Sequence, residues 1–168
     1  NSHLCAGDTL FAVRETSELP SQIVSKQRVA DHGEVLTGSR EVNAMLDLVK
    51  QETLRIDSRF LEPACGNGNF LAEILRRKME VIRKSYRRSQ LDYERNCLIA
   101  IGSLYGIDIL GDNVLECRER LQGDFEKEYR SIFKKNVRDE FIRVIRFVLE
   151  RNIIHGDALT LQTVGQSP

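Results

Sequence analysis

The spacing of apolar residues divides the chain into helical stretches and three short apolar runs. Apolar residues recur every three or four positions over residues 39–56, 69–82, 90–103, 111–133 and 138–149, which predicts five helices. Compact runs at 59–62, 104–108 and 152–155 predict strands. Strands and helices therefore alternate, which is typical of an α/β domain with a parallel sheet and helices on both of its faces.

The same periodicity predicts which side chains face the core. Ser39 is the expected N-cap of the first helix, with Glu41 suited to its first turn. The apolar stripes of the five helices are Val42, Met45, Leu46, Val49 and Ile56; Phe70, Leu71, Ile74, Leu75 and Met79; Leu91, Cys97, Leu98 and Ile101; Val114, Leu115, Cys117 and Leu121; and Phe141, Val144, Ile145 and Val148.

The two ends of the chain are less regular. Pro20 interrupts any long element in residues 1–25, which we treat as an amino-terminal segment whose first residues are consistent with an expression tag. Residues 22–28 fit a short helix, and residues 29–37 and 158–168 read as loops. Residues 26–168 have the length of one domain, without repeats or low-complexity runs.

Composition narrows the class of protein. The 168 residues carry 25 basic and 25 acidic side chains, so the net charge is zero, whereas a separate DNA-binding domain is usually basic. The sequence shows neither a signal peptide nor an apolar run long enough for a membrane helix, and we expect a cytoplasmic location without membrane contact. The four cysteines lack metal-ligand spacing, so we expect reduced thiols and no metal site.

Basic residues are concentrated in one segment. Seven Lys and Arg side chains lie between Arg76 and Arg88, with Glu80 as the only acid among them. Such a cluster can contact phosphates, but a solvated helix face is the favoured interpretation.

The most informative stretch is the glycine turn between the first strand and the second helix. The string is Phe60-Leu-Glu-Pro-Ala-Cys-Gly-Asn-Gly-Asn-Phe70. Gly66 and Gly68 allow positive φ and a close approach of a ligand to the backbone. The following helix offers unpaired N–H groups at its start. Together these features predict a nucleotide-sized site at the carboxyl end of a strand, and a turn without a ligand is the alternative.

The residues around the glycines favour one type of nucleotide. A dinucleotide turn requires a third glycine where this chain has Leu71, and no P-loop string is present. Glu62 would repel a pyrophosphate but can pair with the ammonium group of an amino acid. S-adenosylmethionine combines a nucleoside with an amino acid and fits these residues better.

Each predicted strand ends at or just before an acid. These residues are Glu62, Asp108 and Asp157. Because the carboxyl ends of parallel strands meet at one edge, the three carboxylates are expected to face one crevice. Glu62 would lie near the amino-acid end, Asp108 near the ribose hydroxyls and Asp157 near the adenine amino group. A turn or cap role is the alternative for any one of them.

Four strings in order resemble the amino-terminal, cofactor-binding half of adenine-N6 DNA methyltransferases of bacterial restriction–modification systems. They are Val29-Ala-Asp-His-Gly-Glu-Val-Leu-Thr37, Phe60 to Leu71, Tyr105-Gly-Ile-Asp-Ile109 and Ile154-His-Gly-Asp-Ala-Leu159. The resemblance covers about residues 26–161 and implies a Rossmann-like methyltransferase fold with helical insertions, of which residues 26–168 would form an incomplete cofactor-binding domain. It implies S-adenosylmethionine as cofactor and DNA as partner of the complete enzyme.

The resemblance also assigns roles to individual residues. Thr37 would contact the cofactor carboxylate, although the family's Phe-Thr-Pro is replaced here by Leu36-Thr37-Gly38. Asp108 and Ile109 would hold the ribose and flank the adenine, and Asp157 and Ala158 would bind the adenine edge. The glycine turn would line the methionine end through Glu62, Pro63, Ala64, Cys65, Gly66, Asn67, Gly68 and Phe70.

The family's catalytic motif is absent from this sequence. These enzymes use (Asn/Asp)-Pro-Pro-(Tyr/Phe), and the only prolines here are Pro20, Pro63 and Pro168. We therefore expect no catalytic residues in this chain, as in a fragment or one part of a split enzyme. A non-catalytic subunit acting with a partner is the alternative. A dinucleotide oxidoreductase and an RNA or small-molecule methyltransferase remain open.

An incomplete sheet has one further consequence. A free strand edge tends to pair with another chain. We therefore expect self-association or a partner chain that supplies the catalytic motif.

Overall fold

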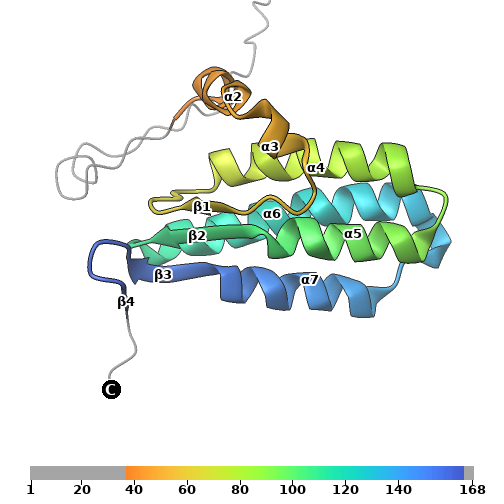
Figure 1. The fold of residues 1–168 in the computed structure, drawn as a ribbon. Helices are drawn as coiled ribbons and strands as arrows, with labels where there is room; N and C mark the ends of the chain where they lie inside the picture. The colour runs from red at the N-terminus through yellow and green to blue at the C-terminus, as the bar shows by residue number, and fades with distance from the viewer. Residues whose placement is uncertain (1–36, 165–168) are drawn as a thin grey trace, which may run out of the picture.

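The computed structural model describes residues 37–164, so the short helix expected at 22–28 and most of the 29–37 loop lie outside the described residues. The described part is an α/β domain with a mostly parallel sheet (Figure 1). Its elements in chain order are α2 (Ser39–Asp47), α3 (Lys50–Leu54), β1 (Phe60–Glu62), α4 (Asn69–Tyr86), α5 (Gln90–Gly102), β2 (Leu104–Asp108), α6 (Gly111–Phe133), the 3₁₀ helix η1 (Lys134–Asn136), α7 (Asp139–Asn152), β3 (Ile153–Asp157) and β4 (Gln162–Thr163).

The sheet has the order β1-β2-β3-β4. The first three strands are parallel, with Leu61 opposite Tyr105 and Asp108 opposite His155. This confirms the three predicted strands. A two-residue β4 pairs antiparallel with β3 inside the predicted carboxyl-terminal loop. This strand was not predicted, because two residues carry no periodicity.

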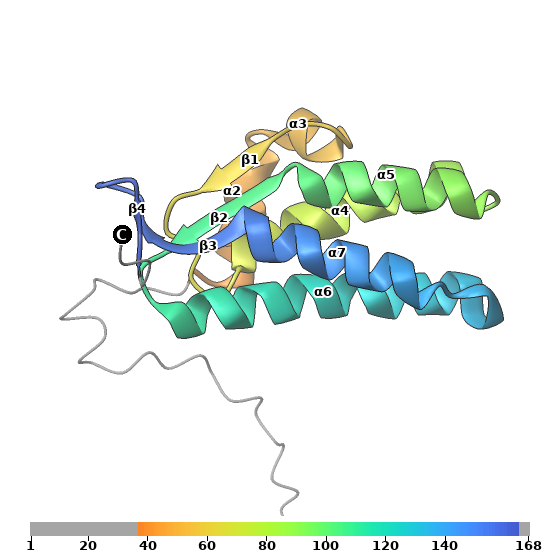
Figure 2. The same ribbon diagram turned by 90° about the horizontal axis from the view of Figure 1, so that it is seen from below.

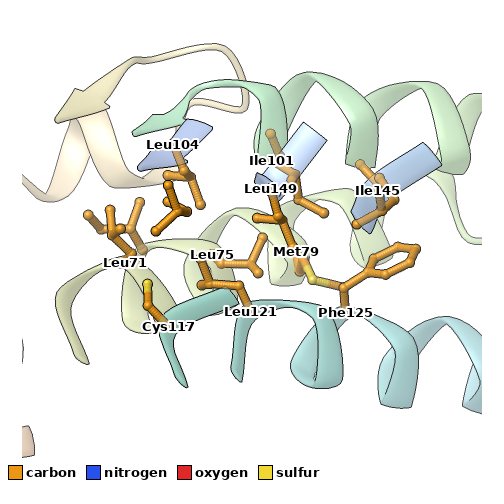
Figure 3. Close-up of a cluster of buried hydrophobic side chains, with 14 of the residues drawn as sticks. Leu71, Leu75, Met79, Ile101, Leu104, Cys117, Leu121, Phe125, Ile145 and Leu149 are labelled. Atoms are coloured by element: carbon orange, nitrogen blue, oxygen red, sulfur yellow. The ribbon is translucent and has the colours of Figure 1, made fainter. Parts of the chain in front are cut away.

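Four long helices form a bundle that extends beyond the sheet. α4 packs against α5 and α6, and α7 packs against α5 and α6. α5 and α7 run directly into β2 and β3, whereas α4 and α6 pass along one face of the sheet (Figure 2). The core lies between the four helices and this face (Figure 3). It includes Leu71, Leu75 and Met79 from α4, Ile101 from α5, Leu104 from β2, Leu121 and Phe125 from α6, and Ile145 and Leu149 from α7.

The predicted first helix is interrupted. It divides into α2 and α3 at Leu48 and Val49, where the N–H groups bond to carbonyls three residues back. The chain then turns so that Thr53, not Val49, is buried against α4. Gly38 occupies the N-cap position expected for Ser39, and a glycine has no side chain to cap the helix.

Several predicted inward residues are exposed. Met45, Val49, Leu91, Leu98, Leu115 and Val144 lie among the exposed large hydrophobic side chains. In α7 the buried stripe is Ile142, Ile145 and Leu149, which is rotated from the predicted one. These helices contact the core through a narrow stripe. Apolar residues at the border of the stripe fit the same periodicity as the buried ones, so the sequence does not distinguish the two.

The second face of the sheet is open in the described part of the chain. Leu61, Tyr105, Ile107 and Ile154 point to it, as the strand register requires. With neighbouring residues they line a hollow of about 400 Å³, and Leu61 is 62% exposed. Figure 1 looks onto this face, with no helix in front of the strands. The expectation of helices on both faces is therefore not met within residues 37–164.

Candidate functional site

The glycine turn joins β1 to α4 as predicted. Gly66 and Gly68 adopt φ values of 50° and 86°, which favour glycine. A Cβ on Gly68 would lie 2.6 Å from Cys117 Sγ of α6, so the turn packs directly on that helix. The turn begins with a backbone bond of 2.9 Å from Cys65 N–H to the Ile107 carbonyl of β2.

Asp108 connects the ends of β1 and β2. Its Oδ2 accepts from Gly66 N–H at 2.8 Å, and its Oδ1 accepts from Leu110 N–H at 2.9 Å and from the Asn113 amide at 3.3 Å. A carboxylate offers about four acceptor positions, so roughly one remains for a ligand. The residue is 8% exposed. Asp108 therefore braces the glycine turn and retains limited capacity for a hydroxyl group.

Glu62 lies at the carboxyl end of β1 and is half-buried. Burial raises the pKa of this carboxyl, and a hydrogen bond from Ala64 N–H opposes that rise. Among the described residues, Glu62 is the only charged one that lines a hollow of about 230 Å³ between α2, β1 and α4. The other lining residues are Met45, Leu46, Val49, Phe60, Leu61, Phe70, Leu71 and Ile74. A carboxylate at an apolar hollow suits a ligand group with positive charge.

Asp157 behaves as a turn residue. Its Oδ1 accepts from Leu159 N–H at 2.8 Å and Thr160 N–H at 3.4 Å. These hydrogen bonds, that of Leu159 foremost, lower the pKa of the carboxyl. Asp157 therefore acts as a turn residue, which is the alternative to a role in ligand binding. It nevertheless lies at the same sheet edge as Asp108.

The remaining predicted residues border the same edge. The Thr37 carbonyl accepts from the Asn69 amide at 2.9 Å, which holds the chain before α2 against the start of α4. The Asn67 amide is buried and donates to Glu116 at 3.2 Å. Pro63, Ala64 and Ile109 are exposed, whereas Phe70 and Ala158 are half-buried and Cys65 is buried.

The Cys65 thiol lies in contact with Cys117. A hydrogen bond between the two thiols, with burial, raises the pKa of Cys65. The same bond lowers the pKa of Cys117. Because both groups are buried, this pair packs the turn onto α6 and is not exposed to a substrate.

Three further residues of this region were not predicted as site residues. Asn69 bonds Thr37 and Arg120, and Asn113 bonds Asp108. His155 lies opposite Asp108 and its Nε2 is 2.9 Å from the Ile109 carbonyl. Asn69 directly follows the glycines and His155 directly precedes Gly156-Asp157. Their position next to these motifs is the feature of the sequence that could have identified them as site residues.

Within residues 37–164 no group of His, Cys, Asp and Glu side chains is arranged to hold a metal ion. None of the helices described is long and apolar enough to cross a membrane.

The chain matches no family model, no curated protein and no solved structure.

Proposed function

We propose that this chain is the S-adenosylmethionine-binding part of a DNA adenine-N6 methyltransferase. The observation that carries the proposal is the link between Gly66 and Asp108, which joins the glycine turn to the end of the neighbouring strand. It brings a backbone cradle, Glu62 and Asp108 to one sheet edge, where ligands of open α/β sheets bind.

The residues of this edge suit both ends of the cofactor. The N-cap residue of α4 is Gly68, which has no side chain to cap the first N–H groups, and a helix start attracts a carboxylate. Glu62 provides the opposite charge for an ammonium group. Asp108 has room for a ribose hydroxyl, and Ile109 is exposed and available to an adenine ring. Asp157 and Ala158 would lie at the adenine edge.

When bound, the cofactor would supply the methyl group that the complete enzyme transfers to adenine N6 in DNA. The residues of this chain would bind and orient it. Since the sequence contains no Pro-Pro pair, the groups that hold the target base would come from another part of the enzyme or from a partner chain.

A non-catalytic subunit with the same fold is the second candidate. The observation that favours it is the open apolar face next to β1, which lies at the end of the sheet. Such a surface suits a partner chain. Co-purification with a chain that carries a proline-proline-aromatic motif would support this candidate.

Isothermal titration with S-adenosylmethionine and S-adenosylhomocysteine tests the proposal. We expect wild type to bind both ligands and Asp108→Ala to bind about 10- to 100-fold more weakly, because a hydrogen bond to a charged group contributes about 1.5–3 kcal/mol. Asp92→Ala removes an exposed acid at the first turn of α5 and should bind like wild type.

Asp108 also braces the turn, so thermal melting must show that the variant is folded. Asp108→Asn, which keeps the shape of the side chain but removes its charge, provides a milder second variant. Absence of heat with either ligand at millimolar concentration would contradict the proposal and favour the non-catalytic subunit.

A further inference from the structure

Basic side chains gather at the end of the helical bundle farthest from the strands. Arg87 and Arg88 form the turn after α4, and Lys134 and Lys135 form η1 after α6. We call these four residues the basic tip. α4 and α6 both end here and α5 and α7 both begin here (Figures 1 and 2).

A hydrogen bond fixes the two parts of the basic tip next to each other. The Gln90 amide at the start of α5 donates to the Asn136 carbonyl of η1 at 2.8 Å. The same amide donates to Tyr129 at 3.0 Å, which joins the tip to the aromatic cluster of the bundle. The four cations are therefore presented by two turns that are held together.

The charges of the basic tip are not neutralised within the described part of the chain. All four side chains are exposed and none forms an ion pair there. Neighbouring cations differ, because Lys84 pairs with Glu80, Arg130 with Glu126 and Asp139, and Arg138 with Glu94. Glu80, Glu94, Glu126 and Asp139 are engaged in these pairs, and Asp92 is an exposed acid close to the tip. Four unpaired cations against this one acid leave a positive patch on a chain of zero net charge.

The surroundings of the tip favour a phosphodiester backbone over a lipid surface. An amphipathic helix that inserts into a membrane surface carries apolar side chains beside its cations. In residues 83–90 and 130–138 no large apolar side chain is exposed, and Leu91 stands alone nearby. Ser85 and Asn136 are exposed polar neighbours that suit phosphate oxygens.

We propose that the basic tip is a sequence-independent docking surface for the phosphate backbone of duplex DNA. This docking surface is separate from the cofactor site of the proposed function. α6 spans 23 residues, which places the basic tip about 34 Å from the sheet edge that would hold the cofactor. The surface contacts phosphates only and leaves the reading of bases to other parts. The choice of DNA over RNA rests on the proposed function.

Fluorescence anisotropy with a labelled random-sequence DNA duplex of about 30 base pairs tests the surface, with salt raised from about 50 to 200 mM. Changing Arg87, Arg88, Lys134 and Lys135 together to Gln should weaken binding more than tenfold at low salt. The plot of log affinity against log salt should become shallower by about 0.9 for each phosphate that the variant no longer neutralises. A duplex RNA of the same length forms a parallel arm.

A control variant changes Arg40, Lys50, Arg59 and Arg146 to Gln, which removes four exposed cations outside the basic tip that also form no ion pair within residues 37–164. It should keep the affinity and the salt slope of wild type. Equal weakening in both variants, or no binding by wild type, would overturn the proposal, and tighter binding of RNA would replace DNA as the partner. Cofactor titration of the tip variant keeps the two proposals separate, since its cofactor affinity should equal that of wild type whatever the DNA result.

Discussion

At the scale of single residues, Gly68 carries the tightest constraint of the candidate site. Its φ of 86° disfavours any side chain, and Cys117 leaves no space for a Cβ. The sequence predicted the need for glycine from its place in the turn. That Cys117 is the neighbour of Gly68 depends on how α6 packs against the turn, and α6 lies far along the chain from Gly68.

We expect Gly68→Ala to lower the free energy of unfolding by about 2–5 kcal/mol, from backbone strain and overpacking together. Denaturant unfolding would measure this change. Gly123→Ala is the control, because an added Cβ there meets nothing within 4 Å in α6, and it should stabilise by about 0.5–1 kcal/mol.

The steric part of the Gly68 effect can be separated from the backbone part. Adding Cys117→Ala to Gly68→Ala removes the clash with Sγ but leaves the Cys117 Cα at 3.3 Å and the positive φ. The double variant should therefore recover part of the stability, in a non-additive manner. Strictly additive effects would show that the two residues are not in contact.

At the same scale, two of the three strand-end acids show what residue type alone cannot decide. Asp108 and Asp157 end strands in the same way in the sequence, yet Asp108 bonds a turn 42 residues away and Asp157 bonds its own turn. Local sequence predicted the position of both carboxylates. Only the three-dimensional arrangement distinguishes the brace from the turn residue.

At the scale of elements, one buried lysine fastens the amino ends of β1 and β2. Lys78 of α4 is fully buried and donates to the Ile56 and Ser58 carbonyls and to Ser103 Oγ at 3.1, 2.5 and 2.5 Å. Its Nζ also lies 5.2 Å from the centre of the Phe60 ring. Burial lowers its pKa to about 8. The sequence placed Lys78 only in a run of basic residues.

We expect Lys78→Met to lower the free energy of unfolding by about 2–4 kcal/mol, because buried acceptors are deprived of a charged donor. Lys84→Met on the same helix is the matched control, since Lys84 is exposed and pairs only with Glu80. Urea unfolding of the two variants gives the comparison. If Lys78→Met destabilises no more than Lys84→Met, then water replaces Lys78 as the hydrogen-bond donor to the two carbonyls and to Ser103 Oγ.

The elements themselves were largely predictable. Each predicted strand and each of the helices α4 to α7 is present, because apolar periodicity and the glycine turn are local properties. The break between α2 and α3 was not predictable, because both helices pack against α4, which lies later in the chain. Exposed residues such as Leu115 and Val144 lie at the border of a stripe, where the sequence pattern does not separate buried from exposed.

At the scale of the whole described domain, the side of β1 that no strand of residues 37–164 pairs with and the open face beside it form one continuous feature. β1 is the end strand of the sheet. Leu61 lines both the hollow between α2, β1 and α4 and the hollow on the open face of the sheet. Edge strands with apolar neighbours tend to add another strand. This supports the expectation of self-association or of a partner chain.

Sedimentation velocity tests this expectation. Wild type should sediment faster as its concentration rises, and Leu61→Lys should remain closer to a monomer, because a charge on the edge opposes strand pairing. Leu115→Lys changes an exposed leucine of α6 and should behave like wild type. A clean monomer of wild type at high concentration would count against self-association and leave a different partner chain as the candidate.

The sequence by itself determined the succession of strands and helices, the glycine turn and the acids at the strand ends. Periodicity, turn chemistry and backbone freedom are set by neighbouring residues, so they can be read locally. Tertiary structure alone decided which sheet face is covered, that Asp108 braces Gly66, that Lys78 is buried, and that Arg87 and Lys134 share one end of the bundle. These features join residues far apart in the chain, and their energies depend on packing that no local pattern encodes.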